Sequence, residues 1–229
     1  ITLAFDSFKG SLTSQEVADA FAEGLHTCVP HCEIHKVTIA DGGEGTTEAL
    51  VEALNGMYVD TTVCDPLGRA ITARYGIVDN GNTAIIEMAK ASGLPLLHPN
   101  ERNPLLTSTY GTGEMILDAL NRGCRNFLIG IGGSATNDGG MGMLSALGYR
   151  FLDKQGNILP GTGEMLAHVT EIDDSHVHPA LRDCHIKVAC DVTNPLYGEN
   201  GAAYIFAPQK GADATMVEQL DNGLRNYAQ

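Results

Sequence analysis

The stretch FLIGIGGSATNDGGMG, residues 127–142, decides the fold of this chain. It begins with a short apolar run, residues 127–131, that is typical of a buried strand. Glycine and polar residues follow over 132–140, and an apolar segment over 141–147 then predicts a helix. A strand, a glycine-rich loop and a helix in this order place backbone N–H groups around an anion, and glycine permits the tight turn. We therefore predict an anion or nucleotide site at this loop.

The loop matches neither of two common nucleotide-binding motifs. It lacks the G-x-x-x-x-G-K-[ST] pattern of a Walker A loop, and its glycines do not have the G-x-G-x-x-G spacing. A strand-to-helix turn that needs glycine only for steric reasons explains the same glycines. The polar side chains of the loop favour phosphate together with a metal ion, because hydroxyl, amide and carboxylate groups occur side by side at Ser134, Thr136, Asn137 and Asp138.

Composition limits the class of protein. The chain has 229 residues, 43% of them hydrophobic, which is enough for one large domain or two small ones. The net charge is −14 and the 14 Lys and Arg residues form no run, so a nucleic-acid partner is disfavoured. No apolar run approaches the length of a membrane span, and no secretory pattern is present. We expect a cytoplasmic protein, and the sequence is compatible with a homo-oligomer.

The pattern of predicted strands and helices changes near residue 57. Before it, strand patterns at 1–5 and 34–40 each lead through a polar loop into a helix, the first of which begins with a capping box at Thr13 and Glu16. After it, alternating segments are joined by turns at 65–69 and 79–82, which predicts an antiparallel meander. We place a boundary between two lobes here.

Acidic residues stand at two further strand ends. Asp41 and Glu44 follow the strand at 34–40, where they either contact a metal or substrate or simply favour the helix N-terminus. Asp191 follows an apolar run, 184–190, that predicts a buried strand. The carboxyl ends of strands in α/β proteins are where functional acids are placed.

Eight blocks carry a resemblance to a known family, in the family's order. They are DSFKGSLTS (6–14), ADGGEGT (40–46), DPLGR (65–69), IEMAKASGL (86–94), YGTGE (110–114), IGIGGSATNDGG (129–140), ACDVTNPLYG (189–198) and PQKGA (208–212). Over essentially its whole length the chain resembles the type-1 glycerate kinase family. Members of that family continue beyond this point, so we expect a further C-terminal segment outside this sequence.

The resemblance implies both a fold and an activity. The fold is α/β with two lobes: residues 1–57 would be the first part of a discontinuous Rossmann- or flavodoxin-like lobe, incomplete here, and residues 58–229 a second, mixed α/β lobe. The activity is ATP-dependent phosphorylation of D-glycerate with Mg²⁺, with 2-phosphoglycerate favoured over 3-phosphoglycerate as the product. The site would lie in the cleft between the lobes, with ATP and D-glycerate as small-molecule partners.

Site residues are assigned as hypotheses on these blocks. Phosphoryl transfer needs positioning and charge neutralisation, so we predict catalytic roles for Asp191, Asp41 and Lys9, although Lys9 can also be read as a solvent-facing loop lysine. Mg²⁺ takes few carboxylates and keeps its waters, which suits Asp191 with Asp138. The predicted contacts to substrate and phosphate are Gly132, Gly133, Ser134, Thr136, Asn137, Asn194, Lys210, Ser7 and Glu44.

Two other enzyme classes compete with a kinase. A phosphosugar isomerase or sugar-phosphate-binding protein also uses Gly, Ser and Thr loops but needs no ATP, so Mg²⁺-dependent nucleotide binding separates it from a kinase. A Rossmann dehydrogenase is disfavoured by the glycine spacing and by the lack of an acid about 20 residues beyond the loop.

Overall fold

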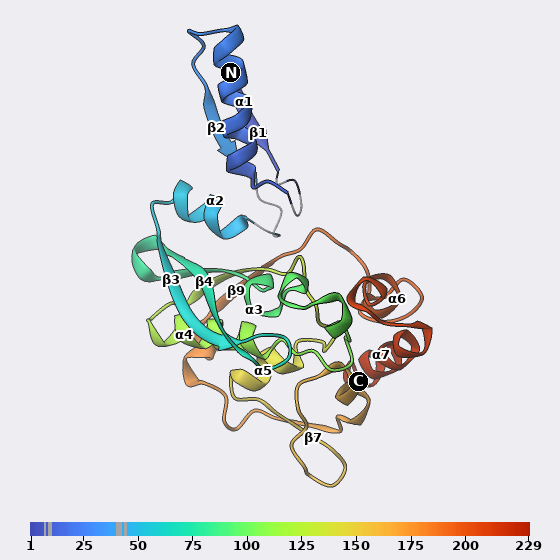
Figure 1. Cartoon of the computed structure of the whole chain (residues 1–229). Coiled ribbons are helices and arrows are strands. Elements are labelled where there is room, and N and C mark those ends of the chain that lie inside the picture. The colour runs from blue at the N-terminus through green and yellow to red at the C-terminus, as the bar shows by residue number, and fades with distance from the viewer. Residues whose placement is uncertain (7, 9–10, 40–42, 44) are drawn as a thin grey trace.

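The computed structural model of the chain describes residues 1–6, 8, 11–39, 43 and 45–229. Within this part, none of the helices is both long and apolar enough to cross a membrane. In chain order the main elements, shown in Figure 1, are β1 (Thr2–Phe5), α1 (Ser14–Cys28), β2 (His35–Thr38), α2 (Thr46–Ala53), β3 (Met57–Cys64), β4 (Ala70–Val78), β5 (Thr83–Glu87), α3 (Ala89–Ser92), α4 (Tyr110–Asn121), β6 (Asn126–Gly130), α5 (Met141–Ala146), β7 (Arg150–Leu152), β8 (Glu171–Asp173), β9 (His185–Ala189), α6 (Ala202–Phe206) and α7 (Ala214–Tyr227).

A five-stranded mixed sheet, with the strand order β3-β4-β5-β6-β9, forms the centre of the fold. The β3–β4 and β4–β5 pairs are antiparallel, whereas β5, β6 and β9 are mutually parallel. The predicted meander is therefore confirmed, and so is the α/β class. The turn between β4 and β5 uses positive φ angles at Asn80 (51°) and Gly81 (93°), which Asn and Gly adopt more readily than other residues.

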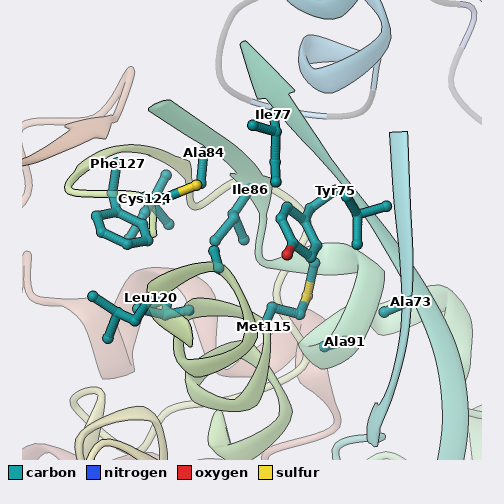
Figure 2. Packing of buried hydrophobic residues seen from close by; sticks show 14 of the residues in the cluster. Ala73, Tyr75, Ile77, Ala84, Ile86, Ala91, Met115, Leu120, Cys124 and Phe127 are labelled. Carbon is teal, nitrogen blue, oxygen red and sulfur yellow. The ribbon is translucent and has the colours of Figure 1, made fainter. Parts of the chain in front are cut away.

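The main core lies between this sheet and α4, as Figure 2 shows. Alternate residues of the strands point toward α4, because side chains alternate between the two faces of a strand. Tyr75 on β4, Ile86 on β5 and Phe127 on β6 meet Met115 and Leu120 of α4, and each of these residues is at most 2% exposed. The hydroxyl of Tyr75 donates to Asp118 on α4 at 2.7 Å, so the one polar atom of that side chain is also paired.

Two smaller clusters complete the described core. On the opposite face of the sheet, α2 packs through Val51 against Val78 and Ile85. A second cluster, which includes Phe151 and Leu220, lies among α5, α6, α7 and β7. This second cluster supports the segment that follows β6, where the glycine-rich loop lies.

The N-terminal elements β1, α1 and β2 lie together at one end of the molecule in Figure 1. β1 and β2 form a parallel two-stranded sheet. The predicted capping box of α1 is confirmed: the Thr13 N–H donates to the Glu16 carboxylate at 2.8 Å, and the Glu16 N–H donates to Thr13 Oγ1 at 3.2 Å. The two-lobe division near residue 57 stays a prediction. α2, which precedes that point, contacts β4 and β5.

One strand differs from its expectation. The run 184–190 predicts a buried strand, but Ile186 and Val188 of β9 are 48% and 55% exposed. β9 is the last strand in the order and pairs only with β6 among the described strands. An apolar run shows that a strand forms but does not show whether the strand is central or at an edge, so the expectation of burial was wrong.

Candidate functional site

Three parallel strands end in one row at the same edge of the sheet. Glu87, the last residue of β5, pairs with Gly130 at the end of β6, and Gly130 pairs with Ala189 at the end of β9. The segments that leave these strands therefore start side by side. They include the glycine-rich loop after Gly130 and the segment that contains Asp191. Ligands of α/β proteins bind outside the carboxyl ends of strands, so this edge is the candidate site.

The glycine-rich loop is fixed by backbone hydrogen bonds to the segment 88–94. The Leu94 N–H donates to the Gly133 carbonyl at 2.9 Å, and the Ala135 N–H donates to the Ser92 carbonyl at 2.9 Å. Gly133 has a φ of 74°, a conformation that side-chain-bearing residues rarely adopt. The loop thus has a defined shape that depends on a segment about forty residues earlier in the chain.

Lys210 places a buried amine directly under this loop. Its side chain reaches the loop from beyond α6; the residue is 6% exposed. Its Nζ donates to Ser134 Oγ at 2.7 Å and to the Thr136 carbonyl at 2.6 Å. Burial lowers the pKa of Lys210 to about 8, although the Asp138 carboxylate acts in the opposite direction. At pH 7 the amine is therefore mostly protonated.

The protonated amine orients the Ser134 hydroxyl. A lysine ammonium donates three hydrogen bonds and accepts none, so the Ser134 oxygen must accept from Lys210. The hydroxyl proton of Ser134 is then directed away from Lys210. Ser134 is half-buried, so this proton can reach a bound ligand. The structure thus brings together two predicted site residues, and the pair suits an anion on the outer side of the loop.

Asp138 holds the loop to the rest of the protein. Its Oδ2 accepts hydrogen bonds from the Thr109 N–H (2.8 Å), the Thr109 hydroxyl (2.7 Å) and the Gly142 N–H (3.1 Å). Its Oδ1 accepts from the Gly140 N–H at 3.2 Å. The residue is 1% exposed, and burial raises the pKa of its carboxyl while these hydrogen bonds oppose that rise. Both oxygens are committed to protein donors, so the geometry does not favour the predicted metal-binding role.

The remaining predicted residues of the loop are inward-facing or carry little side chain. Thr136 and Asn137 are 5% and 7% exposed. The Asn137 amide donates weakly to the Ala202 carbonyl at 3.5 Å, and its Oδ1 is a buried atom without a hydrogen-bond partner in the described chain. Gly132 is half-buried and offers its backbone alone.

Asp191 and Asn194 lie on the neighbouring segment and are exposed. Asp191 comes two residues after Ala189 of β9, and Gly132 comes two residues after Gly130 of β6. Because Gly130 and Ala189 are paired, the segment with Asp191 and the glycine-rich loop leave the sheet at the same end. The Asn194 amide donates to the Asn200 carbonyl at 2.9 Å, which closes the segment into a turn. Asp191 is exposed, so a ligand in the solvent can approach its carboxylate.

Four predicted residues, Ser7, Lys9, Asp41 and Glu44, lie outside the described residues. Their roles stay predictions. Within the described part of the chain, no group of three or more His, Cys, Asp or Glu side chains is arranged to hold a metal ion. This is compatible with Mg²⁺ in a kinase, because Mg²⁺ is commonly bound by one or two carboxylates together with substrate phosphates.

Sequence reasoning missed two residues at this edge, Glu87 and Lys90. Glu87 is 2% exposed and accepts from the Thr47 N–H at 2.7 Å, and Lys90 Nζ donates to Glu48 at 3.2 Å. The signal was present: Glu87 ends the apolar run of β5 just as Asp191 follows that of β9, so the rule applied to Asp191 would also have found Glu87.

Comparisons with known proteins agree along the whole chain. The model of the glycerate kinase family matches residues 1–229. A glycerate 2-kinase of Escherichia coli K12 is 50% identical over 229 residues, which are all of this chain and 60% of that protein. A glycerate kinase of Haemophilus influenzae is 51% identical over 227 residues, 99% of this chain and 60% of its own length. A crystal structure of a protein described as glycerate kinase 2, from Salmonella typhimurium LT2, superposes with a TM-score of 0.88 at 49% identity and covers 99% of this chain and 61% of that one. The chain therefore spans about 60% of the length of these relatives.

Proposed function

Because the chain belongs to the glycerate kinase family over residues 1–229, we propose that the protein phosphorylates D-glycerate with ATP. The observation that carries the proposal is the Lys210–Ser134 pair under the glycine-rich loop, at the edge where three parallel strands end. A fixed loop, a buried cation and an outward-directed hydroxyl supply what phosphoryl transfer asks of a protein, which is positioning and stabilisation of charge. We favour 2-phosphoglycerate as the product, because the Escherichia coli relative is a glycerate 2-kinase.

Each described residue has a separate part in this proposal. The backbone of Gly132 and Gly133 would approach the phosphoryl oxygens closely, since no side chain intervenes. The Ser134 hydroxyl would donate a hydrogen bond to one of these oxygens, and the Lys210 ammonium would supply positive charge on the inner side of the loop. Negative charge is spread over the equatorial oxygens of the transferring group in the transition state. A Lys210 ammonium held in place beside these oxygens would therefore stabilise the transition state more than the ground state.

The exposed carboxylate of Asp191 fits a bound Mg²⁺ better than Asp138 does. Asp191 is solvent-accessible, whereas the oxygens of Asp138 accept four hydrogen bonds from the protein. Asp191 would therefore hold the ion, and Mg²⁺ would supply neutralisation of the phosphate charge. Asp41 and Asp191 remain the candidates for orienting or deprotonating the attacking hydroxyl of glycerate, with Lys9 as a further cation.

The test is a coupled assay of ADP release by the full-length protein with ATP, Mg²⁺ and D-glycerate. We expect ADP formation that depends on glycerate, and phosphorus–carbon coupling in the NMR spectrum of the product should place the phosphate on carbon 2. Ser134→Ala should lower turnover by roughly ten- to a hundredfold, the loss of one charge-assisted hydrogen bond in the transition state. Lys154→Met, which removes an exposed surface lysine, should turn over normally.

The assay also separates the competing enzyme class. A well-folded full-length protein that binds sugar phosphates but neither binds ATP nor releases ADP would refute the kinase proposal. Full turnover by Ser134→Ala would leave the kinase assignment intact but remove the Lys210–Ser134 pair from the chemistry.

A further inference from the structure

The segment that leaves β9, residues 190–198, carries two predicted site residues, Asp191 and Asn194. We call it the Asp191 segment. Residues 191–197 are all exposed, and Gly198 at its far end is half-buried. An exposed segment of this length loses conformational entropy when it is ordered, so it keeps one shape only where contacts hold it. The contacts of this segment therefore decide where the Asp191 carboxylate lies.

Local hydrogen bonds close the end of the segment into a turn. The Asn194 amide donates to the Asn200 carbonyl at 2.9 Å, and the Gly201 N–H donates to the Gly198 carbonyl at 2.7 Å. Both bonds join residues that are close in sequence. They give the segment a shape, but its place on the protein requires a contact with a distant element.

Asp221 of α7 supplies such a contact. Its Oδ1 accepts from the Gly198 N–H at 2.6 Å, and its Oδ2 lies 3.3 Å from a guanidinium nitrogen of Arg225. Asp221 is only 4% exposed. Hydrogen bonds to an ionised carboxylate are stronger than those between neutral groups. The far end of the Asp191 segment is thus tied to a buried charge on a helix that packs in the core.

Arg225 extends the same contact to the neighbouring residue. Its guanidinium carbon lies 5.0 Å from the centroid of the Tyr197 ring, which is within the range of a cation–π interaction. The Asp221–Arg225 ion pair therefore touches two consecutive residues of the segment, Tyr197 and Gly198. The side chain of Arg225 is 53% exposed, so its contact is the weaker of the two.

The same helix also contacts the glycine-rich loop. A Cβ placed on Gly139 would lie 3.1 Å from two ring carbons of Tyr227 at the end of α7. The loop and the Asp191 segment leave the paired ends of β6 and β9, and α7 touches the first through Tyr227 and the second through Asp221. A displacement of about 1 Å in a reacting group can lower a rate about a hundredfold, so a helix that holds both segments suits phosphoryl transfer.

We propose that Asp221 is a positioning residue, which places Asp191 for metal binding by holding Gly198 on α7. The inference rests on the proposed kinase function, in which Asp191 holds Mg²⁺. Asp221 acts through the backbone of the Asp191 segment, and Arg225 supports it from the outer side. The buried carboxylate of α7 thus has a role in the site beyond the stability of the helix.

The first test needs neither metal nor substrate. In hydrogen–deuterium exchange of the full-length protein, Asp221→Ala should make peptides from residues 190–201 exchange roughly tenfold faster, because the Gly198 N–H loses its acceptor. Asp221→Asn keeps an acceptor oxygen and should exchange like the wild type. Asp213→Ala is the matched control on the same helix: it removes the N-cap that accepts from the Met216 N–H at 2.8 Å, so it should destabilise α7 without changing exchange in this segment.

The second test measures metal binding without turnover. Mn²⁺, which suits the same oxygen ligands as Mg²⁺, is titrated with a non-hydrolysable ATP analogue and an excess of full-length protein, and free Mn²⁺ is followed by electron paramagnetic resonance. Asp221→Ala should weaken Mn²⁺ binding roughly tenfold, as the loss of a group that orients a metal ligand does, and Arg225→Gln by about two- to threefold. Asp221→Asn and Asp213→Ala should bind like the wild type. In an Asp191→Asn protein, Asp221→Ala should have no further effect.

The outcomes are distinct. If the wild-type full-length protein releases no ADP with ATP, Mg²⁺ and D-glycerate, the proposed function fails. If the wild type turns over but Asp221→Ala binds Mn²⁺ normally, or Asp213→Ala weakens binding equally, Asp221 has only a structural role and the inference alone fails. An additive effect of Asp221→Ala in the Asp191→Asn protein would show that it does not act through Asp191. Arg225 is on the surface, so an unchanged Mn²⁺ affinity of Arg225→Gln counts against the inference even if Asp221→Ala folds poorly.

Discussion

Replacing Asp138 by Ala should destabilise the protein strongly, whether or not metal is present. Asp138 was predicted as a metal ligand, but its carboxylate accepts four hydrogen bonds, two of them from Thr109 and the others from Gly140 and Gly142. The substitution removes this acceptor and leaves four buried or half-buried donors facing a small cavity. A structural residue and a metal ligand therefore predict different results in the absence of metal.

The magnitude follows from the hydrogen bonds. Each donor left without a partner costs about 1–3 kcal/mol, and the two bonds at 3.1 and 3.2 Å lie at the weak end of that range. Relief from burying a charge offsets part of the loss, as the raised pKa of Asp138 indicates. We expect a net loss of about 3–5 kcal/mol, which is a large fraction of the total stability of about 5–15 kcal/mol that is usual for folded proteins.

The assay is urea unfolding followed by circular dichroism, first with EDTA and then with Mg²⁺. Asp138→Ala should lose the same free energy of unfolding in both. Asp138→Asn keeps an acceptor for Thr109 and Gly142 and loses chiefly the bond to Gly140, so it should cost only about 1–2 kcal/mol. The reasoning is refuted if Asp138→Ala unfolds like wild type in EDTA and lacks only the stabilisation that Mg²⁺ gives.

Three further changes test the packing and the buried charges. Gly113→Ala should lower the free energy of unfolding in urea by about 2–3 kcal/mol, because the new Cβ would lie 2.3 Å from the Met143 carbonyl oxygen. Gly24 is a helical glycine with open space around it, so Gly24→Ala should leave the stability unchanged or raise it by about 0.5–1 kcal/mol. Equal effects of the two substitutions would refute the contact. Burial raises the pKa of Glu87, so its contribution to stability is full below the ordinary Glu pKa and is lost as pH rises through the raised pKa. Glu87→Gln should remove this part of the wild-type pH dependence. Parallel curves of unfolding free energy against pH for the two proteins would contradict the raised pKa. Burial lowers the pKa of Lys210 to about 8, so its contribution to stability is full above the ordinary Lys pKa and is lost as pH falls through about 8. An NMR titration of its Nζ should have a midpoint near that value. A midpoint at an ordinary Lys pKa would show that the amine is solvated.

Local signals in the sequence predicted the elements well, because the physics that forms them is local. The turn at 79–82 specified the hairpin between β4 and β5 through residues that accept positive φ. Thr13 and Glu16 marked the start of α1 because both partners of a capping box lie within four residues. The strand, loop and helix over 127–142 were likewise visible in the order of residue types alone.

The parts that were missed, or that the observed contacts do not favour, depend on distant partners. Asp138 looks like a ligand in the sequence because its partner Thr109 is 29 residues away. Lys90 looks like an ordinary helix lysine because Glu48 is 42 residues away. The exposure of β9 depends on strand order, which no property of residues 184–190 encodes. Sequence patterns thus identified the glycine-rich loop as the candidate site, whereas the contacts of its residues within the protein became visible only in the tertiary structure.

The link between Lys210 and the glycine-rich loop has a consequence for how the protein emerges from the ribosome. Lys210 follows Ser134 by 76 residues in the chain. At ordinary rates of translation the loop is therefore synthesised roughly 4–15 s before the amine that will lie beneath it. During that interval the nascent loop has its glycines and hydroxyls but lacks the Lys210 ammonium, so under the proposed function it should attract nucleotide only weakly. Ligand binding by ribosome-bound chains of increasing length should accordingly appear only once residue 210 has left the exit tunnel.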